Sequence, residues 1–132
     1  MTVLVDTSAL YALLVATDAA HDVARRAFAR HAEPGRLVTH NYVVVETVSL
    51  LQVRIGTDAV RSLVDELLPA LIVGWVDAET HAAALARVAD GPRSVSLVDR
   101  VSFAVMRRRG ITTAFAFDED FRREGFEMVP ES

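Results

Sequence analysis

Blocks of hydrophobic and polar positions along the 132-residue chain predict an alternation of strands and helices. Residues 2–6 contain three successive apolar side chains, which is typical of a strand buried on both faces of a parallel sheet. The pattern predicts further strands at 37–39, 71–76, 112–117 and 126–129. Apolar residues at helical spacing predict helices at 9–14, 19–31, 42–53 and 58–68, two more after Asp77 and Ser96, and a turn or short helix at 118–123.

Capping residues set the expected ends of several helices. Thr17 or Asp18 would begin the helix 19–31, and Thr57 would begin the helix 58–68, which Pro69 would end. Ser96 and Asp99 have the spacing of a capping box, although glutamate is the usual third partner. Because strands and helices alternate throughout, we expect an α/β fold: one domain over residues 1–132, a three-layer α/β/α sandwich with a mainly parallel sheet.

Composition excludes several classes of site. The chain has no cysteine, so disulfides, thiolate-bound zinc and a cysteine nucleophile are ruled out, and a metal would need oxygen or imidazole ligands. We find neither an apolar stretch long enough to cross a membrane nor a signal peptide, and expect a cytoplasmic protein without membrane contact. All basic residues are arginine; they cluster at 25–26, 107–109 and 122–123, where they form either solvated helix faces or contacts to a polyanion.

Two aspartates directly follow predicted strands. Asp6 ends the first apolar run and Asp118 ends the run 112–117. Taken alone, each is explained as a helix N-cap. The carboxyl ends of parallel strands nevertheless meet at the edge of the sheet where ligands bind, so the two carboxylates can also belong to one site.

Two further acids come from predicted helices. Glu46 lies within a largely apolar stripe, where an unpaired carboxylate would cost several kcal/mol. Asp99 lies in a first helical turn, where the capping box alone accounts for it. If these acids meet Asp6 and Asp118, each close pair repels by about 3 to 4 kcal/mol, which a divalent cation relieves. Oxygen-only ligation favours Mg²⁺, with Mn²⁺ as the other option.

The four acids lie in sequence contexts that resemble one known family. "VLVDTSAL", "NYVVVET", "SLVDRVSFAVMRRRG" and "AFAFDEDFRREGF" together are similar to the PIN-domain nucleases, in particular the small VapC-like toxins of type II toxin-antitoxin systems. The resemblance spans nearly the whole chain. It implies an acidic metal site formed by Asp6, Glu46, Asp99 and Asp118.

Three other positions are compared with the family pattern. Ser8 matches a small hydroxyl residue beside the site, and Asp120 matches an additional acid whose role stays open. Ala116 departs from the pattern, because many relatives carry a hydroxyl residue there, and this puts one polar contact near the site in doubt.

The resemblance implies a metal-dependent endoribonuclease that cleaves tRNA, rRNA or mRNA by activating a water molecule. Its expected partners are the RNA and a VapB-like antitoxin, in a homodimer or a hetero-oligomer with that antitoxin. The apolar helices after Glu46 and Thr57 either form core or offer the antitoxin a groove. The arginine clusters become candidates for contacts to RNA.

Alternatives from other classes remain. The chain could be a PIN-fold RNA-binding or processing protein outside a toxin-antitoxin module. A metal-free histidine mechanism is disfavoured because His21, His31, His40 and His81 lie on separate predicted elements. A phosphoryl-accepting α/β domain is disfavoured because such domains usually need a lysine at the site, and the chain has none.

Overall fold

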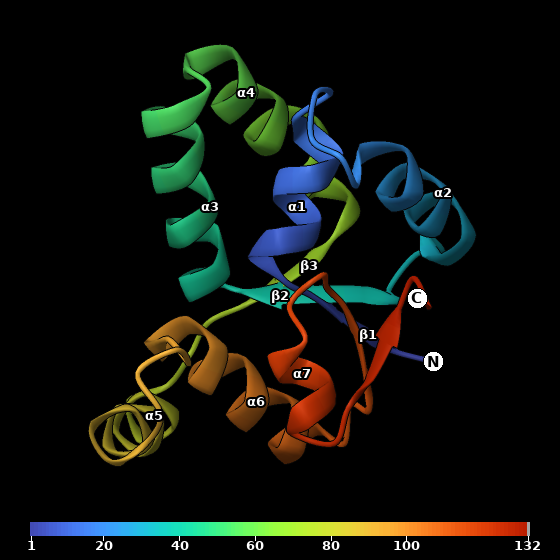
Figure 1. Cartoon of the computed structure of the whole chain (residues 1–132). Helices are drawn as coiled ribbons and strands as arrows, with labels where there is room; N and C mark the ends of the chain where they lie inside the picture. Colours follow the sequence, from blue (N-terminus) through green and yellow to red (C-terminus); the bar gives the residue numbers. More distant parts are fainter. Residues whose placement is uncertain (132) are drawn as a thin grey trace.

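A five-stranded parallel sheet forms the centre of the protein in the computed structural model, which describes residues 1–131 (Figure 1). The strands are β1 (Val3–Val5), β2 (Leu37–His40), β3 (Ile72–Gly74), β4 (Thr113–Phe115) and β5 (Glu127–Val129). Their order is β3-β2-β1-β4-β5, and every neighbouring pair is parallel. The predicted α/β class with a parallel sheet is therefore confirmed.

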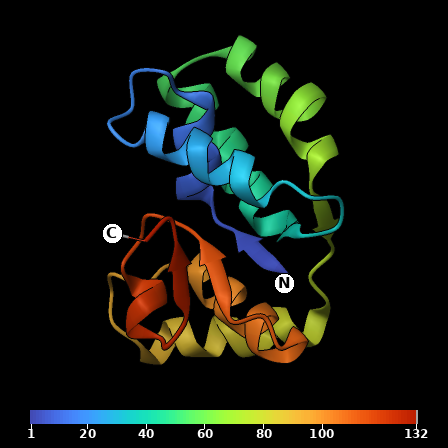
Figure 2. The ribbon, with the colours of Figure 1, turned by 90° about the vertical axis from the view of Figure 1, so that its right-hand side faces the viewer.

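Helices cover both faces of the sheet. One face carries α1 (Thr7–Leu14), α2 (His21–His31), α3 (Asn41–Arg54) and α4 (Thr57–Ser62). The other carries α5 (Ala78–Asp90), α6 (Leu97–Arg109) and α7 (Asp120–Arg123). Figure 2 shows the resulting layers, with the helices of the first half of the chain on one side and those of the second half on the other. No helix within residues 1–131 is long and apolar enough to cross a membrane.

Strand β1 is the centre of two hydrophobic cores. Its side chains alternate between the faces of the sheet, as the pleat requires. Val3 and Val5 belong to the core under α1, α2 and α3, whereas Leu4 packs with Phe103 and Met106 of α6. All three β1 side chains are fully buried, which explains why the strand has no polar alternation.

Two predicted helix starts were wrong. α2 begins at His21 without a side-chain cap, because Asp18 instead accepts a hydrogen bond from the backbone N–H of Ala20 (3.0 Å) in the preceding turn. α4 begins at Thr57 itself, with Gly56 as N-cap. Gly56 has a φ of 133°, a conformation that residues with a Cβ rarely adopt.

The predicted helix 58–68 is continuous only in its first part. After α4 the chain continues through a π-helical turn (Leu63–Leu67) and a 3₁₀ turn (Leu68–Ala70). Pro69 has no N–H for an α-helical hydrogen bond, so the regular pattern ends before it.

The strand predicted at 71–76 is shorter and more exposed than expected. β3 is an edge strand that pairs only with β2, and Ile72 and Val73 are half-exposed. The backbone leaves the sheet after Gly74, because the N–H of Val76 donates to the side chain of Asn41 (2.8 Å) instead of to a strand.

The strand order creates a crevice beside β1. The chain moves outward from β1 to β2 and β3, then returns to the other side of β1 as β4. Ligands of parallel sheets bind at such a switch point, outside the carboxyl ends of the strands. Here those ends belong to β1 and β4. Asp6 follows β1 directly, and Asp118 lies three residues after the last residue of β4.

Candidate active site

Asp6 lies at the carboxyl end of β1 and is the N-cap of α1. Its Oδ2 accepts hydrogen bonds from the backbone N–H of Ser8 (3.2 Å) and from the Ser8 hydroxyl (2.6 Å). Its other oxygen, Oδ1, is buried and has no hydrogen-bond partner within residues 1–131. Buried polar atoms nearly always have a hydrogen-bond partner, so we expect this oxygen to bind a ligand from outside the described residues.

Ser8 connects the ends of the two central strands. Its hydroxyl donates to Asp6 and accepts a hydrogen bond from the backbone N–H of Phe117 (2.9 Å), just after β4. The hydroxyl thereby fixes the Asp6 carboxylate relative to the segment that leads into Asp118. Ala116 contributes nothing polar there, since its side chain is buried in the core with Leu4.

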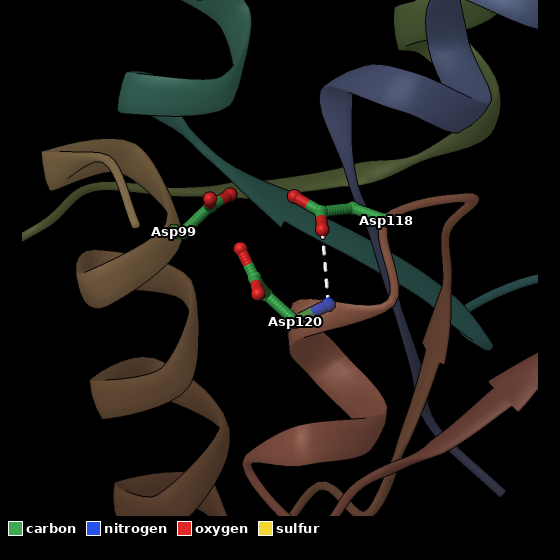
Figure 3. Close-up of side chains that lie close together, drawn as sticks. All are labelled: Asp99, Asp118 and Asp120. Atoms are coloured by element: carbon green, nitrogen blue, oxygen red, sulfur yellow. Dashed lines mark hydrogen bonds between the residues drawn. The ribbon is translucent and has the colours of Figure 1, made fainter. Parts of the chain in front are cut away.

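Asp99, Asp118 and Asp120 form a compact group, shown in Figure 3. Each offers a carboxylate oxygen, and these oxygens lie within 4.8 Å of one another. Asp118 also accepts a hydrogen bond from the backbone N–H of Asp120 (2.9 Å), which holds the loop before α7. Asp120 is almost fully buried despite its charge and pairs with Arg123 (2.7 Å).

The capping box at the start of α6 is only half formed. The Ser96 hydroxyl accepts from the backbone N–H of Asp99 (3.1 Å), but within residues 1–131 the backbone N–H of Ser96 does not donate to the Asp99 carboxylate in return. The Asp99 carboxylate is therefore available to the acidic group, and capping alone does not account for it.

Glu46 projects from the middle of α3 into the same cleft. Its side chain is half-buried, between the largely apolar stripe of α3 and the acids at the strand ends. The cleft has a volume of about 430 Å³, and all four predicted acids line it: Asp6, Glu46, Asp99 and Asp118. Asp99 and Asp118 also belong to the group with Asp120, so they lie where the two sets of acids overlap.

The electrostatics of the cleft show how close these acids are. Burial, followed by smaller contributions from Glu46 and Asp118, raises the pKa of Asp6 from 3.8 to about 6, although the Ser8 hydrogen bonds oppose the shift. Burial, and then repulsion from Asp6, Asp118 and Glu46, raises the pKa of Asp99 to about 7. Within residues 1–131, Asp6, Glu46, Asp99 and Asp118 thus repel one another, and none of them forms an ion pair with a basic side chain.

A divalent cation fits this arrangement. The donors are carboxylate oxygens, one of them is buried without a partner, and the group repels itself. Hard cations such as Mg²⁺ and Mn²⁺ prefer oxygen ligands and bind through few carboxylates, leaving positions for water and substrate phosphate.

Most of the clustered arginines lie in surface ion pairs rather than in the cleft. Arg107 pairs with Glu124, and Arg108 with Asp77 and Glu79. The 122–123 cluster is similarly paired, with Glu119 and Asp120 as the partners. The solvated-face interpretation therefore fits these two clusters better than contact with RNA.

Sequence reasoning missed two features of the site. The role of Asp120 was left open, although an acid two residues after Asp118 is a signal that both face one turn. Tyr11 and Arg54 also line the cleft, and no local pattern singles them out. Their approach depends on the packing of α1 against α3.

Sequence comparison with known proteins identifies the family of the chain. The family model of the PIN domain matches residues 3–127. The chain belongs to the PIN-domain family. This PIN domain is 41% identical to the 23S rRNA-specific endonuclease VapC20 of Mycobacterium tuberculosis, over 98% of this chain and 99% of that protein. The predicted VapC-like resemblance is thereby confirmed.

Solved structures agree in fold. The crystal structure of VapC20 from M. tuberculosis, described as a sarcin-ricin loop cleaving toxin, has a TM-score of 0.85 and 37% identity, covering 95% of this PIN domain and 96% of that chain. A protein from Pyrobaculum aerophilum has a TM-score of 0.66 and 19% identity, covering 98% and 90%. At this low sequence identity, the second match shows a similar fold and nothing further.

Proposed function

We propose that the protein is a VapC-type endoribonuclease that cleaves RNA with the help of Mg²⁺ or Mn²⁺ bound in the acidic cleft. The observation that carries the proposal is the unpartnered, buried Oδ1 of Asp6 beside other acids that repel it. Membership of the PIN-domain family and the identity to a ribosomal RNA endonuclease support it.

The residues of the cleft have distinct proposed tasks. Asp6, Asp99 and Asp118 would hold the metal, with Glu46 and Asp120 completing the acidic surroundings. A bound divalent cation lowers the pKa of a water molecule and neutralises charge that develops on the phosphate. Ser8 keeps the Asp6 carboxylate in one orientation, and a carboxylate of the cluster accepts the proton of the attacking water.

We propose ribosomal RNA as the substrate. The relative that matches over almost the whole chain is named for cleavage of 23S rRNA, whereas nothing in this structure favours tRNA or mRNA. A structured RNA requires recognition beyond the scissile bond.

Incubation of the purified protein with total ribosomal RNA, followed by mapping of the RNA ends, tests the activity. We expect cleavage with Mg²⁺ or Mn²⁺, no cleavage in EDTA, and a loss of at least about 100-fold in Asp6→Asn, on the scale of lost charge stabilisation at a transition state. Cleavage that persists in EDTA would contradict the metal-dependent mechanism.

We further propose that the protein acts in the cytoplasm as a toxin whose partner is a VapB-type antitoxin. A groove of about 470 Å³ between α1, α2 and the π-helical turn suits an amphipathic antitoxin helix. Its lining includes the apolar Leu13, Leu14 and Phe28 and the charged Arg25 and Glu66. Of the two uses left open for the apolar residues after Glu46, core or groove, Leu51 is fully buried in the core.

Induction in cells, with and without a co-expressed antitoxin, tests the toxin assignment. We expect growth arrest by the wild type, no arrest by Asp6→Asn, and rescue by the antitoxin. Phe28→Glu should keep the nuclease activity but escape rescue, because it places a charge in the apolar groove. Cleavage of RNA without growth arrest would favour a processing enzyme outside a toxin-antitoxin module.

A further inference from the structure

The acidic cleft has a cationic end. Tyr11 of α1 and Arg54 in the last turn of α3 both line it, away from the strand ends. The guanidinium carbon of Arg54 lies over the Tyr11 ring, 5.9 Å from the ring centroid. A cation–π contact of this kind restrains the guanidinium group over the ring while leaving its N–H groups free to bind a ligand.

Both residues continue stripes that begin at the acids. On α3, Glu46, Leu50 and Arg54 recur every four residues and line the cleft together. At about 1.5 Å per residue, Arg54 begins about 12 Å along the helix from Glu46. On α1, whose N-terminus Asp6 caps, Ser8 and Tyr11 are three residues apart and line the cleft from one face of the helix. The two helices therefore form walls that run from the acidic end to the Tyr11–Arg54 contact.

Arg54 contacts the Tyr11 ring but pairs with no carboxylate within residues 1–131. Among the described residues it is the only cation lining a cleft with five acids: Asp6, Asp18, Glu46, Asp99 and Asp118. It is exposed and makes no ion pair within residues 1–131, although Asp18 and Glu46 line the same cleft. Its N–H groups are therefore available to a ligand in the cleft.

We propose that Tyr11 and Arg54 form a phosphate subsite for the RNA strand, separate from the metal site. The Arg54 guanidinium binds a phosphate that flanks the scissile one, and Tyr11 is a positioning residue that restrains the guanidinium group. Leu50, between Glu46 and Arg54 on α3, gives the intervening sugar an apolar surface. This subsite rests on the proposed ribonuclease function and names how that site holds its substrate.

The subsite solves an electrostatic difficulty. A cleft with five carboxylates repels a polyanion, and one divalent cation offsets only part of that charge. Bidentate N–H contacts from arginine to phosphate are strong and oriented, so a cation beyond the metal draws the strand along the cleft.

Steady-state cleavage of a sarcin–ricin stem-loop RNA with Mg²⁺ tests the subsite in four variants. Arg54→Met should raise KM on the order of tenfold with kcat nearly unchanged, since a flanking contact contributes to binding of substrate and transition state alike. Tyr11→Leu should raise KM less, and Tyr11→Phe should match the wild type because it keeps the ring. Arg26→Met, an exposed arginine of α2 outside the cleft, is the matched control.

Binding of the same labelled RNA to an Asp6→Asn background gives a readout without cleavage. There, adding Arg54→Met should lower the slope of log affinity against log salt by about one, the effect of one lost phosphate contact. Thermal melts should be unchanged, since Arg54 is exposed.

Three outcomes would overturn the subsite. Arg54→Met could behave like Arg26→Met in KM and salt slope; it could lower kcat with KM unchanged, which would place Arg54 on the scissile phosphate; or it could weaken antitoxin binding alone, which would assign the contact to the antitoxin. In each case the wild type still cleaves RNA. Absence of metal-dependent cleavage by the wild type would instead contradict the proposed function.

Discussion

At the scale of single residues, Asp6 uses its two carboxylate oxygens for different contacts. One oxygen caps α1 and binds the Ser8 hydroxyl, while the other is buried without a partner. The alternatives that the sequence leaves open, helix cap or metal ligand, are therefore compatible. The cap holds the side chain in the orientation that leaves Oδ1 available.

Replacement of Ser8 should affect both stability and activity. Ser8→Ala removes the donor to Asp6 and leaves the N–H of Phe117 without its acceptor, which should lower the free energy of unfolding by about 1–3 kcal/mol. Nuclease activity should fall by roughly 10- to 100-fold, the usual effect of losing a contact that orients a metal ligand. Urea unfolding and initial rates of RNA cleavage measure the two effects.

A matched serine provides the control for this variant. Ser49 is exposed, and its hydroxyl donates only to the carbonyl of Val45 on its own helix (2.9 Å). Ser49→Ala should therefore leave both measurements nearly unchanged. Equal losses in the two variants would show that the Ser8 bridge does not orient Asp6.

The raised pKa values at the site predict an unusual pH dependence for the metal-free protein. Between about pH 4 and 7 the folded state keeps protons on Asp6 and Asp99 that the unfolded chain has released, so stability falls as pH rises. His40 has the opposite effect on stability. Burial lowers its pKa from 6.5 to about 4, so between these pH values the folded state keeps it neutral while the unfolded chain binds a proton. Burial also lowers the pKa of His31, which acts in the same direction as His40. We expect the combined pKa shifts of Asp6 and Asp99 to set the net pH dependence.

Neutralising one acid should therefore stabilise the metal-free protein. In EDTA at pH 8, Asp99→Asn should raise the free energy of unfolding by on the order of 2 kcal/mol, and its stability should vary less between pH 5 and pH 8. Urea titrations at both pH values measure this, with the fully exposed Asp58→Asn as control. A less stable Asp99→Asn would mean that the carboxylate makes necessary native contacts.

At the scale of elements, an ion-pair cluster fixes α7 against α6. Arg100 and Arg107 of α6 both donate to the Glu124 carboxylate, at 2.9 and 2.8 Å. Arg100 is almost fully buried, so Glu124 is needed to compensate its charge. The cluster sets how Asp99 at the start of α6 faces Asp120 at the start of α7.

Removal of the Glu124 charge should loosen this arrangement. Glu124→Gln should lower the free energy of unfolding by about 3 kcal/mol, because it leaves Arg100 buried without a counter-charge. It should also weaken Mg²⁺ binding in calorimetry, since Asp120 loses its fixed position. Glu119→Gln is the control: its pair with Arg122 is half-exposed and should contribute less than about 0.5 kcal/mol.

The elements themselves could largely be predicted from the sequence, and their ends could not. Apolar patterning located the strands and most helices, because it reflects which faces the sheet buries. The errors lie where backbone geometry competes with a side-chain cap, as at Gly56 and Asp18, or where an edge strand lacks a second partner, as in β3.

The candidate site was predictable in part for a similar reason. Asp6 and Asp118 follow central strands, and the carboxyl ends of such strands meet wherever the sheet is parallel. The grouping of Asp120 with Asp99 and the stacking of Arg54 on Tyr11 depend on how helices pack. Such contacts between distant segments leave no spacing signal in a single sequence.

At the scale of the whole molecule, a bound metal ion would raise the free energy of unfolding in addition to its proposed role in catalysis. A ligand at about 100 times its dissociation constant adds about 2.7 kcal/mol to the free energy of unfolding. For a chain of this length, the melting temperature should rise by roughly 10 °C. Thermal melts with and without Mg²⁺ should show this shift in the wild type but not in Asp6→Asn, and an equal shift in both would place the metal elsewhere.

The position of β4 in the sheet also determines when the site can form during synthesis. Asp6 and Glu46 emerge well before Asp118 and Asp120, and β4 must pair beside β1 before the acids meet. The Ser8 contact to Phe117 joins residues 109 positions apart. A nascent chain therefore carries an incomplete site until β4 and the acids that follow it have been synthesised, so the proposed nuclease activity cannot appear before that point.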